Sequence, residues 1–258
     1  MIDSPSNSLD SPGPSDGSLG DGFSVCLDAL RFMTAIAVVL YHARYLEFGG
    51  QVFGVGYRYG WDAVKVFFVL SGFVIAYVAE TKSNSLPLFF RDRLSRLYSV
   101  VVPAILVTCI ADSLGHLLAP EMYTEKFFSG EWPIARLAAN LTFANQLWFA
   151  NIRPLSNAPF WSLGYEFWFY AIFACTTFLS GWNRIATTLI VAVIAGPKIL
   201  LLFPVWWMGV WSFRTGRTMQ RKTGLLLLIW TITFGWVYYQ VGLPKYIQAC
   251  TEVLLGQS

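Results

Sequence analysis

The feature that most constrains this chain is a series of long apolar runs that recurs along nearly its whole length. They cover residues 25–45, 62–79, 97–119, 137–150, 159–181, 185–213 and 224–243. Several approach the roughly 20 residues that a helix needs to cross the hydrocarbon core of a bilayer. Only 13% of the 258 residues are charged, well below the roughly one quarter typical of a soluble domain. The sequence therefore predicts an all-α fold, a polytopic transmembrane bundle of about 7–8 membrane segments.

The runs do not have the pattern of a membrane β-barrel, whose strands alternate apolar and polar residues. Stretches such as "VFFVL" and "LLLLIW" are apolar on every side, which favours helices. The run 185–213 is interrupted by Gly196, Pro197 and Pro204, so we expect a broken helix that lines a cavity. Residues 1–22 are rich in Ser, Pro and Asp and predict a disordered tail, which leaves residues 23–258 as the membrane-embedded domain.

The placement of basic residues predicts the orientation, because short cytoplasmic loops of membrane proteins are enriched in Lys and Arg. Two loops are basic, one with Lys82, Arg91, Arg93 and Arg96, the other with Arg214, Arg217, Arg221 and Lys222. Residues 119–135 hold three glutamates and one lysine, which fits the outer side. We therefore expect a cytoplasmic N-terminus.

Charge and cysteine content argue against two kinds of partner. The formal net charge of +3 is too small to indicate nucleic-acid binding. The four cysteines lie far apart in the sequence without the spacing of metal ligands, so we expect no metal.

The first apolar run carries two ionisable residues, Arg31 and His42. Eleven helical steps leave them about 20° apart around the axis and about 16 Å apart along it. They therefore share a face and are candidates for lining one passage through the bundle, since ionisable residues in such segments usually face the interior. The alternative is an Arg that reaches the membrane surface and a His bonded to a neighbouring helix.

Two further patterns are candidates for a functional site, a carboxylate in an apolar segment and a pair of arginines. Glu166 lies among aromatic residues with Ser162 one turn earlier, and a carboxylate there needs a partner or a proton. The partner could be Arg31, His42 or a substrate hydroxyl, with a structural ion pair as the alternative. Arg93 and Arg96 share one face where the third helix starts, which suits an anionic cofactor or plain anchoring at the membrane surface.

Asp112 and His116 lie four residues apart near the outer end of the same helix. Side chains of this kind either bind a polar acceptor or meet water at the membrane surface.

Four stretches together resemble the acyltransferase-3 family of polytopic membrane acyltransferases, in the same order and with similar separations. They are "LDALRFMTAIAVVLYH", "AVKVFFVLSGFVIAY", "FFRDRLSRLY" and "PFWSLGYEFWFY". The first carries the family's Arg and His as Arg31 and His42, the third its paired arginines and the fourth its buried Glu as Glu166. Lys65 stands where the family often has Asp, and the family usually has more helices than this chain provides.

The resemblance implies an integral protein of a bacterial inner membrane that transfers an acyl group from cytoplasmic acyl-CoA, with acetyl-CoA as the expected donor. The acceptor would be a hydroxyl of an extracytoplasmic or lipid-linked carbohydrate, with membrane lipid as the surroundings. His42 would be general base or acyl carrier. The predicted site residues are Glu166 and Arg31 beside His42 in catalysis, Arg93, Arg96 and Arg91 at the cofactor, and Ser162, Trp161 and Ser71 at the acceptor.

Two other functions fit the same residues. A transporter or flippase for a polar lipid-linked molecule would also place Arg and Glu near the midplane, and a truncated relative would be inactive. Transfer of label from acetyl-CoA distinguishes the enzyme from both.

Overall fold

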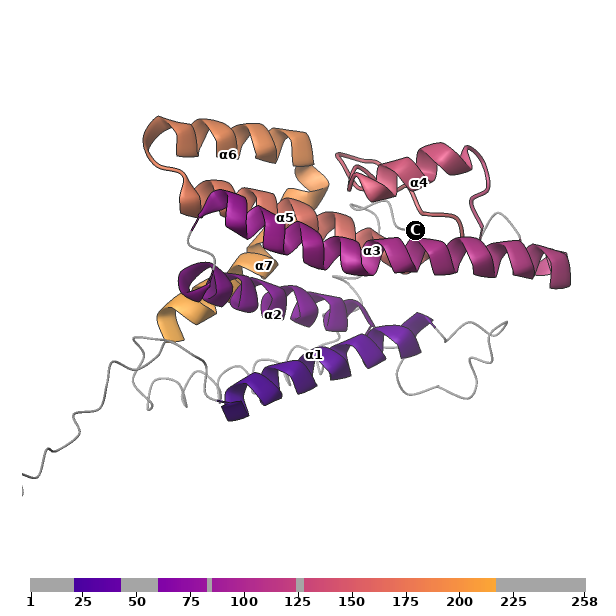
Figure 1. Ribbon diagram of the computed structural model, residues 1–258, viewed down its shortest axis with the longest axis horizontal. Coiled ribbons are helices and arrows are strands. Elements are labelled where there is room, and N and C mark those ends of the chain that lie inside the picture. Colours follow the sequence, from indigo (N-terminus) through magenta and orange to yellow (C-terminus); the bar gives the residue numbers. More distant parts are fainter. Residues whose placement is uncertain (1–20, 43–59, 83–84, 124–127, 217–258) are drawn as a thin grey trace, which may run out of the picture.

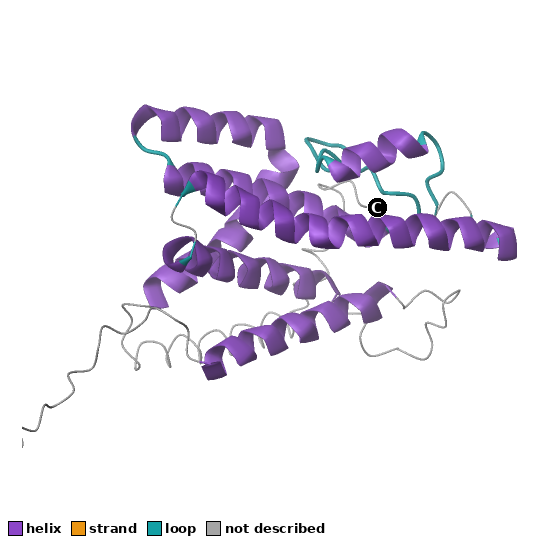
Figure 2. Ribbon diagram, in the orientation of Figure 1, coloured by secondary structure: helices purple, strands orange, loops and turns teal. Residues whose placement is uncertain are grey.

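A computed structural model describes residues 21–42, 60–82, 85–123 and 128–216. These residues form helices and loops without strands (Figure 2). The α-helices are α1 (Asp21–His42), α2 (Gly60–Thr81), α3 (Leu86–Leu118), α4 (Pro133–Leu141), α5 (Trp161–Phe178), α6 (Gly181–Ala195) and α7 (Pro197–Gly216). Two 3-10 turns, Pro120–Met122 and Ala158–Phe160, follow α3 and precede α5. The all-helical fold is confirmed for the described part of the chain.

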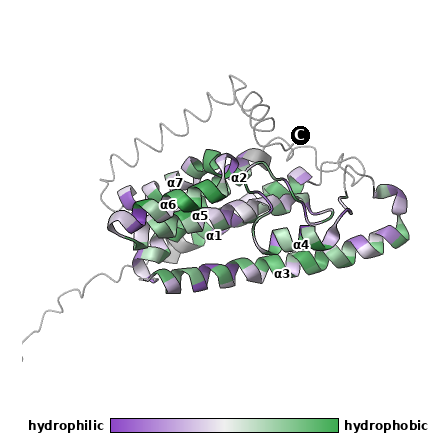
Figure 3. Cartoon of the chain, turned by 90° about the horizontal axis from the view of Figure 1, so that it is seen from above, coloured by the Kyte–Doolittle hydropathy of each residue, from purple (hydrophilic) through white to green (hydrophobic). Residues whose placement is uncertain are grey.

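Three of these helices, α1, α2 and α3, are long and apolar enough to cross a membrane, and the bent pair α6 and α7 would make a fourth span. Apolar residues recur along the longer helices, interleaved with polar ones (Figure 3). The chain therefore has the spans of an integral membrane protein. The expected total of 7–8 segments stays a prediction, since the apolar run 224–243 lies outside the described residues.

The helices lie side by side in a bundle (Figure 1). α2 packs against α1 on one side and α7 on the other, and α5 packs against α3 and α6. Buried aromatic rings fill the centre, where Trp206 of α7 contacts Phe169 and Phe173 of α5. Phe68 of α2 meets the same layer through Phe169. Aromatic packing of this kind contributes beyond area burial and joins α2, α5 and α7.

The 33-residue α3 starts earlier than its apolar run indicates. Ser85 precedes the helix in an extended conformation and Pro87 lies in its first turn, where a missing backbone N–H costs nothing. The basic residues Arg91, Arg93 and Arg96 therefore lie in α3, as the shared helical face of Arg93 and Arg96 predicted, and of the basic residues assigned to that loop only Lys82 lies outside the helix. The buried stripe of α3 repeats every three or four residues and consists of Phe89, Arg93, Leu97, Val101, Ile105, Thr108 and Asp112.

The apolar stretch 137–150 is not a membrane span. The 9-residue α4 ends at Leu141, and an irregular segment leads from Thr142 to α5. Phe143, Trp148 and Leu155 have positive φ there, a conformation that non-glycine residues adopt only when their surroundings hold it. The backbone N–H of Trp148 donates to the Ala195 carbonyl (3.1 Å), and the buried Lys198 ammonium donates to the Ala150 carbonyl (2.8 Å).

The predicted break in the run 185–213 is confirmed. α6 and α7 are bent by 119° at Gly196. Gly196 has a φ of 83°, which favours glycine, and Pro197 follows it as the first residue of α7. A Cβ at Gly196 would also meet the Trp148 backbone. The break therefore lies where the irregular segment docks.

Candidate functional site

Polar side chains from three helices form a hydrogen-bonded group inside this aromatic core, which we call the Glu166 group. It consists of Ser71 of α2, Glu166 and Tyr170 of α5, and Trp206 of α7. All four are buried, with exposures of 8% or less. A polar cluster at this depth is costly unless its members satisfy one another.

Glu166 is the acceptor on which the group depends. The Ser71 hydroxyl donates to Glu166 Oε1 at 2.9 Å, and the Tyr170 hydroxyl donates to the same oxygen. The indole N–H of Trp206 donates to the Ser71 hydroxyl at 3.3 Å. Glu166 and Tyr170 lie one helical turn apart, so α5 itself places the tyrosine on the carboxylate.

Two arginines on other helices lie near enough to this carboxylate to interact with it electrostatically. Arg31 of α1 lies within electrostatic range of Glu166 and Tyr170, and so does Arg93 of α3. The structure therefore brings together Arg31, Arg93 and Glu166, three residues that sequence patterns singled out separately. Among the described residues the hydrogen-bond partners of Glu166 are Ser71 and Tyr170, and none of the ion pairs joins it to Arg31, so the predicted pairing with Arg31 stays a prediction.

Arg93 lacks the partners that a buried guanidinium normally has. Its side chain is 9% exposed, and its Nε and Nη1 atoms find no acceptor among the described residues. Buried donors without acceptors are rare in proteins, and guanidinium forks bind phosphate and carboxylate well. This arrangement suits an anionic ligand.

The other two predicted cofactor residues differ from Arg93. Arg96 is exposed and lies within electrostatic range of Arg31 and Arg93. Arg91 points away from the buried stripe: its side chain is 74% exposed and forms an ion pair with Asp92 at 3.1 Å. Exposed pairs of this kind contribute little to stability.

His42 is the last residue of α1, three turns beyond Arg31. It is half-buried, and its ring packs edge-on against Tyr41 with centroids 5.2 Å apart. It does not belong to the Glu166 group. The distance along α1 puts the imidazole about 16 Å further along the bundle than Arg31.

The predicted acceptor residues separate into two places. Ser71 is buried in the Glu166 group. Ser162 and Trp161 lie at the start of α5, where the Ser162 hydroxyl donates to the Pro159 carbonyl at 3.4 Å and the Trp161 ring packs on Phe68 and Tyr165. α1 and α3 end, and α5 begins, at the same end of the bundle (Figure 1).

Asp112 has a structural task that its sequence pattern did not show. It is 5% exposed and accepts from the backbone N–H of Ser156 (3.1 Å) and from its hydroxyl (2.6 Å). Asn157 donates to Thr108 at 2.9 Å. These bonds fasten the segment before α5 onto α3, so Asp112 is occupied and does not meet water. His116 stacks on Tyr123.

Sequence reasoning missed two members of the Glu166 group. Tyr170 could have been found, because a residue four positions after a buried Glu shares its helical face. Trp206 carries no such signal, since only the packing of α7 on α2 brings it to Ser71. No cluster of three or more His, Cys, Asp or Glu side chains that could hold a metal occurs in the part of the chain that the structure describes.

The chain matches the acyltransferase-3 family model, described as an acyltransferase domain, over residues 24–249. It is 31% identical over 154 residues to the acyltransferase MdmB of Streptomyces mycarofaciens, covering 57% of this chain and 37% of that protein. It is 30% identical over 198 residues to the O-acetyltransferase OatA of Staphylococcus aureus strain NCTC 8325, covering 69% of this chain and 29% of that protein. No solved structure matches it significantly. Since the family model covers most of its length, the chain belongs to the acyltransferase-3 family.

Proposed function

We propose that the protein is an integral membrane O-acyltransferase. It would move an acyl group, acetyl in the simplest case, from cytoplasmic acyl-CoA to a hydroxyl of an extracytoplasmic or lipid-linked carbohydrate. Its family and the name of OatA, an O-acetyltransferase, support the reaction class. The observation that carries the proposal is the buried Arg93, whose Nε and Nη1 find no acceptor among the described residues and which lies within electrostatic range of Glu166.

The donor would enter from the end where α3 begins. Arg93 offers guanidinium donors without acceptors of their own, and Arg96 adds a charge one turn along. Charge-assisted bonds from such a pair suit the phosphates of coenzyme A. Arg91 would contribute long-range attraction only, because Asp92 already neutralises it.

Glu166 would keep this interior ordered. Its carboxylate balances Arg31 and Arg93 and holds Ser71 and Tyr170. Because the group ties α2, α5 and α7 together, it would fix the route by which the thioester reaches the opposite end.

His42 would act at that opposite end. In direct transfer, the imidazole takes the proton of the acceptor hydroxyl, whose oxygen attacks the thioester carbonyl carbon. The C–S bond breaks, and the coenzyme A thiolate takes the proton from the imidazolium. In the two-step alternative the imidazole itself first accepts the acyl group. Trp161 and Ser162, at the start of α5, would contact the carbohydrate.

A transporter of a polar lipid-linked molecule is the second candidate, because α6 and α7 form a bent pair and transporters use broken helices at their substrate sites. A transporter would leave acetyl-CoA intact.

The test follows label from acetyl-CoA into carbohydrate and measures the release of free coenzyme A thiol. The chain has two histidines, so His116→Ala is a matched control for His42→Ala. His42→Ala should lower the rate roughly 100-fold to 10,000-fold, as for other proton-transfer groups, with His116→Ala close to the parent. A well-folded His42→Ala protein that works at the parental rate would end the catalytic assignment. No thiol release by the parent would favour the transporter.

A further inference from the structure

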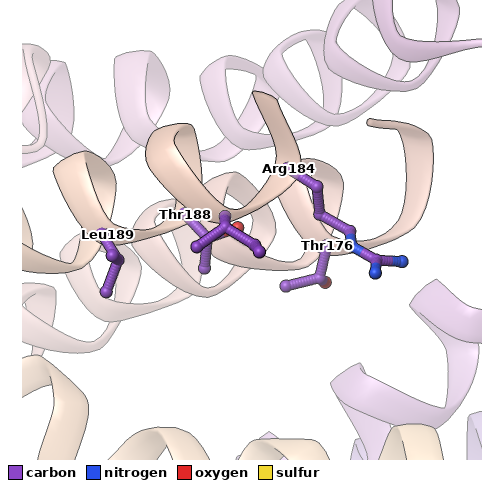
Figure 4. A pocket seen from close by; sticks show the side chains of 5 residues that line it. Thr176, Arg184, Thr188 and Leu189 are labelled. Atoms are coloured by element: carbon purple, nitrogen blue, oxygen red, sulfur yellow. The ribbon is translucent and has the colours of Figure 1, made fainter. Parts of the chain in front are cut away.

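A cavity of about 400 Å³ opens between α5 and α6, outside the Glu166 group. It is lined by Thr176, Arg184, Ile185, Thr188 and Leu189. It is a groove open to the outside rather than an enclosed pocket, with a volume at the low end of ligand sites in proteins. Figure 4 shows Arg184 and Thr176 at one end of the cavity, Leu189 at the other and Thr188 between them. One end is therefore cationic and the other aliphatic.

Within the described part of the chain, no ion pair neutralises the charge at the cationic end. Arg184 is exposed, and the ion pairs of the described residues all involve other side chains. Thr188 also lines the cavity, with its hydroxyl turned away from the surface and without a hydrogen-bond partner in the described ranges. An exposed guanidinium without an ion-pair partner favours an anionic group.

The aliphatic end continues into an exposed apolar face. Leu189, Ile190 and Val193 of α6 are 58% to 63% exposed. Such a surface fits the hydrocarbon of a membrane. Trp182, one turn before Ile185, is 76% exposed, and tryptophan is enriched at the level of lipid head groups. A ligand that satisfies both ends has an anionic head and an apolar tail.

The position of the cavity agrees with this ligand. α5 ends and α6 begins at the end of the bundle where α2 ends and α3 begins (Figure 1). That end also carries Lys82, Arg91 and Arg214. Basic residues mark the cytoplasmic side, where anionic lipids are abundant and bind basic pockets between helices. The cavity lies on the α6 flank of the bundle, whereas α1 with Arg31 covers the opposite flank.

We propose that the cleft between α5 and α6 is a binding site for an anionic phospholipid. Its phosphate contacts the Arg184 guanidinium, and the upper part of one acyl chain lies along Ile185 and Leu189. Because α6 leads into the break at Gly196 on which the Trp148 segment rests, a bound lipid braces the helix that supports that segment. The site is separate from the donor and acceptor sites of the proposed enzyme.

The experiment titrates the purified full chain in neutral detergent with phosphatidylglycerol or phosphatidylcholine and counts bound lipids by native mass spectrometry. Arg184→Gln should weaken phosphatidylglycerol binding roughly tenfold or more, the loss expected for one charge-assisted contact. Arg184→Lys should keep part of the affinity. Arg214→Gln is the matched control, because it removes the same charge at the same end from a side chain already paired with Glu80.

Three results would overturn the proposal. They are equal losses for Arg184→Gln and Arg214→Gln, equal affinity of the parent for the two lipids, and an Arg184→Gln protein that binds lipid normally but needs more acetyl-CoA. The last would assign Arg184 to the donor. A Leu189→Trp variant, which fills the aliphatic end, should weaken binding of both lipids and so tests the cavity without touching its charge.

Discussion

Glu166 combines two tasks that separate substitutions can distinguish. It accepts hydrogen bonds from Ser71 and Tyr170, and it supplies the negative charge that faces Arg31 and Arg93. Glutamine keeps an acceptor oxygen and removes the charge. Phenylalanine at Tyr170 removes one donor and keeps the charge.

Glu166→Gln should therefore lower kcat by about 100-fold, because the buried Arg93 and the half-buried Arg31 lose a nearby negative charge and an uncompensated buried charge costs about 3–5 kcal/mol. Tyr170→Phe should lower it by about tenfold at most, since one hydrogen bond contributes about 1 kcal/mol. Turnover of both variants is compared with their thermal stability. Losses that follow only the amount of folded protein would make the group purely structural.

The paired arginines of α3 differ in surroundings, and this predicts different effects on the donor. Arg93→Ala should raise the KM for acetyl-CoA about tenfold or more, because it removes charge-assisted contacts worth about 1.5–3 kcal/mol. Arg93→Lys should recover part of the affinity, since a lysine keeps the charge without the fork. Arg91→Ala is the comparison and should change KM less than about threefold. An unchanged KM for Arg93→Ala would return Arg93 to a membrane anchor.

Single residues also show which parts of the candidate site could be predicted from the sequence. Glu166 and Arg31 stood out because charges in apolar runs need a partner, and the structure gives Glu166 the hydroxyls of Ser71 and Tyr170. The separate roles of Arg93 and Arg91 could not be predicted, because periodicity marks a shared face but not which neighbour already satisfies a charge. Asp92 next to Arg91 is a local partner, whereas Arg93 lies on the buried stripe of α3, where packing between helices decides its surroundings.

Helices were predictable where apolar length alone decides. α1, α2 and the broken pair α6 and α7 follow from the runs and from Gly196 and Pro197. The predicted membrane segment at 137–150 was wrong, because the apolar side chains after α4 belong to an irregular segment that packs on other helices. Contacts of Trp148, Ala150 and Ser156 with other helices hold its backbone, and these long-range contacts leave no periodic pattern.

The approach of α2 to α7 depends on two glycines. A Cβ at Gly209 would collide with the Val69 carbonyl and the Phe73 N–H of α2, and one at Gly72 with the Trp206 carbonyl of α7. Small residues allow membrane helices to pack this closely. The same contact keeps Trp206 on Ser71.

Gly209→Leu should therefore destabilise the protein by about 1–3 kcal/mol, as overpacking does, and it should also lower turnover by moving Trp206. Gly216→Leu is the control on the same helix, because none of the residues that the structure describes lies within 4 Å of a Cβ there. Thermal unfolding in detergent measures the difference. Equal stability of the two variants would contradict the close packing of α2 on α7.

The bundle as a whole has chemically different ends. Basic side chains gather where α2 ends and α3 begins, and Glu121 and Glu131 lie at or near the other end, after α3. The direction of acyl transfer in the proposed function requires the basic end to face the cytoplasm, because acyl-CoA is made there. The positive-inside rule also places the basic end in the cytoplasm. One measurement of the orientation therefore tests the predicted topology and the proposed direction of acyl transfer.

Cysteine labelling tests this orientation in whole cells. Ser85 and Glu121 are both exposed and lie at the two ends of α3, so each is changed singly to cysteine in a chain whose four native cysteines are serine. An impermeant maleimide added outside should label Glu121→Cys and leave Ser85→Cys unlabelled until the membrane is opened, because the bilayer keeps the reagent from the cytoplasmic side. The reverse pattern would place Arg93 outside, away from acyl-CoA, and would contradict the proposed donor site whatever the substitutions at Arg93 do to KM.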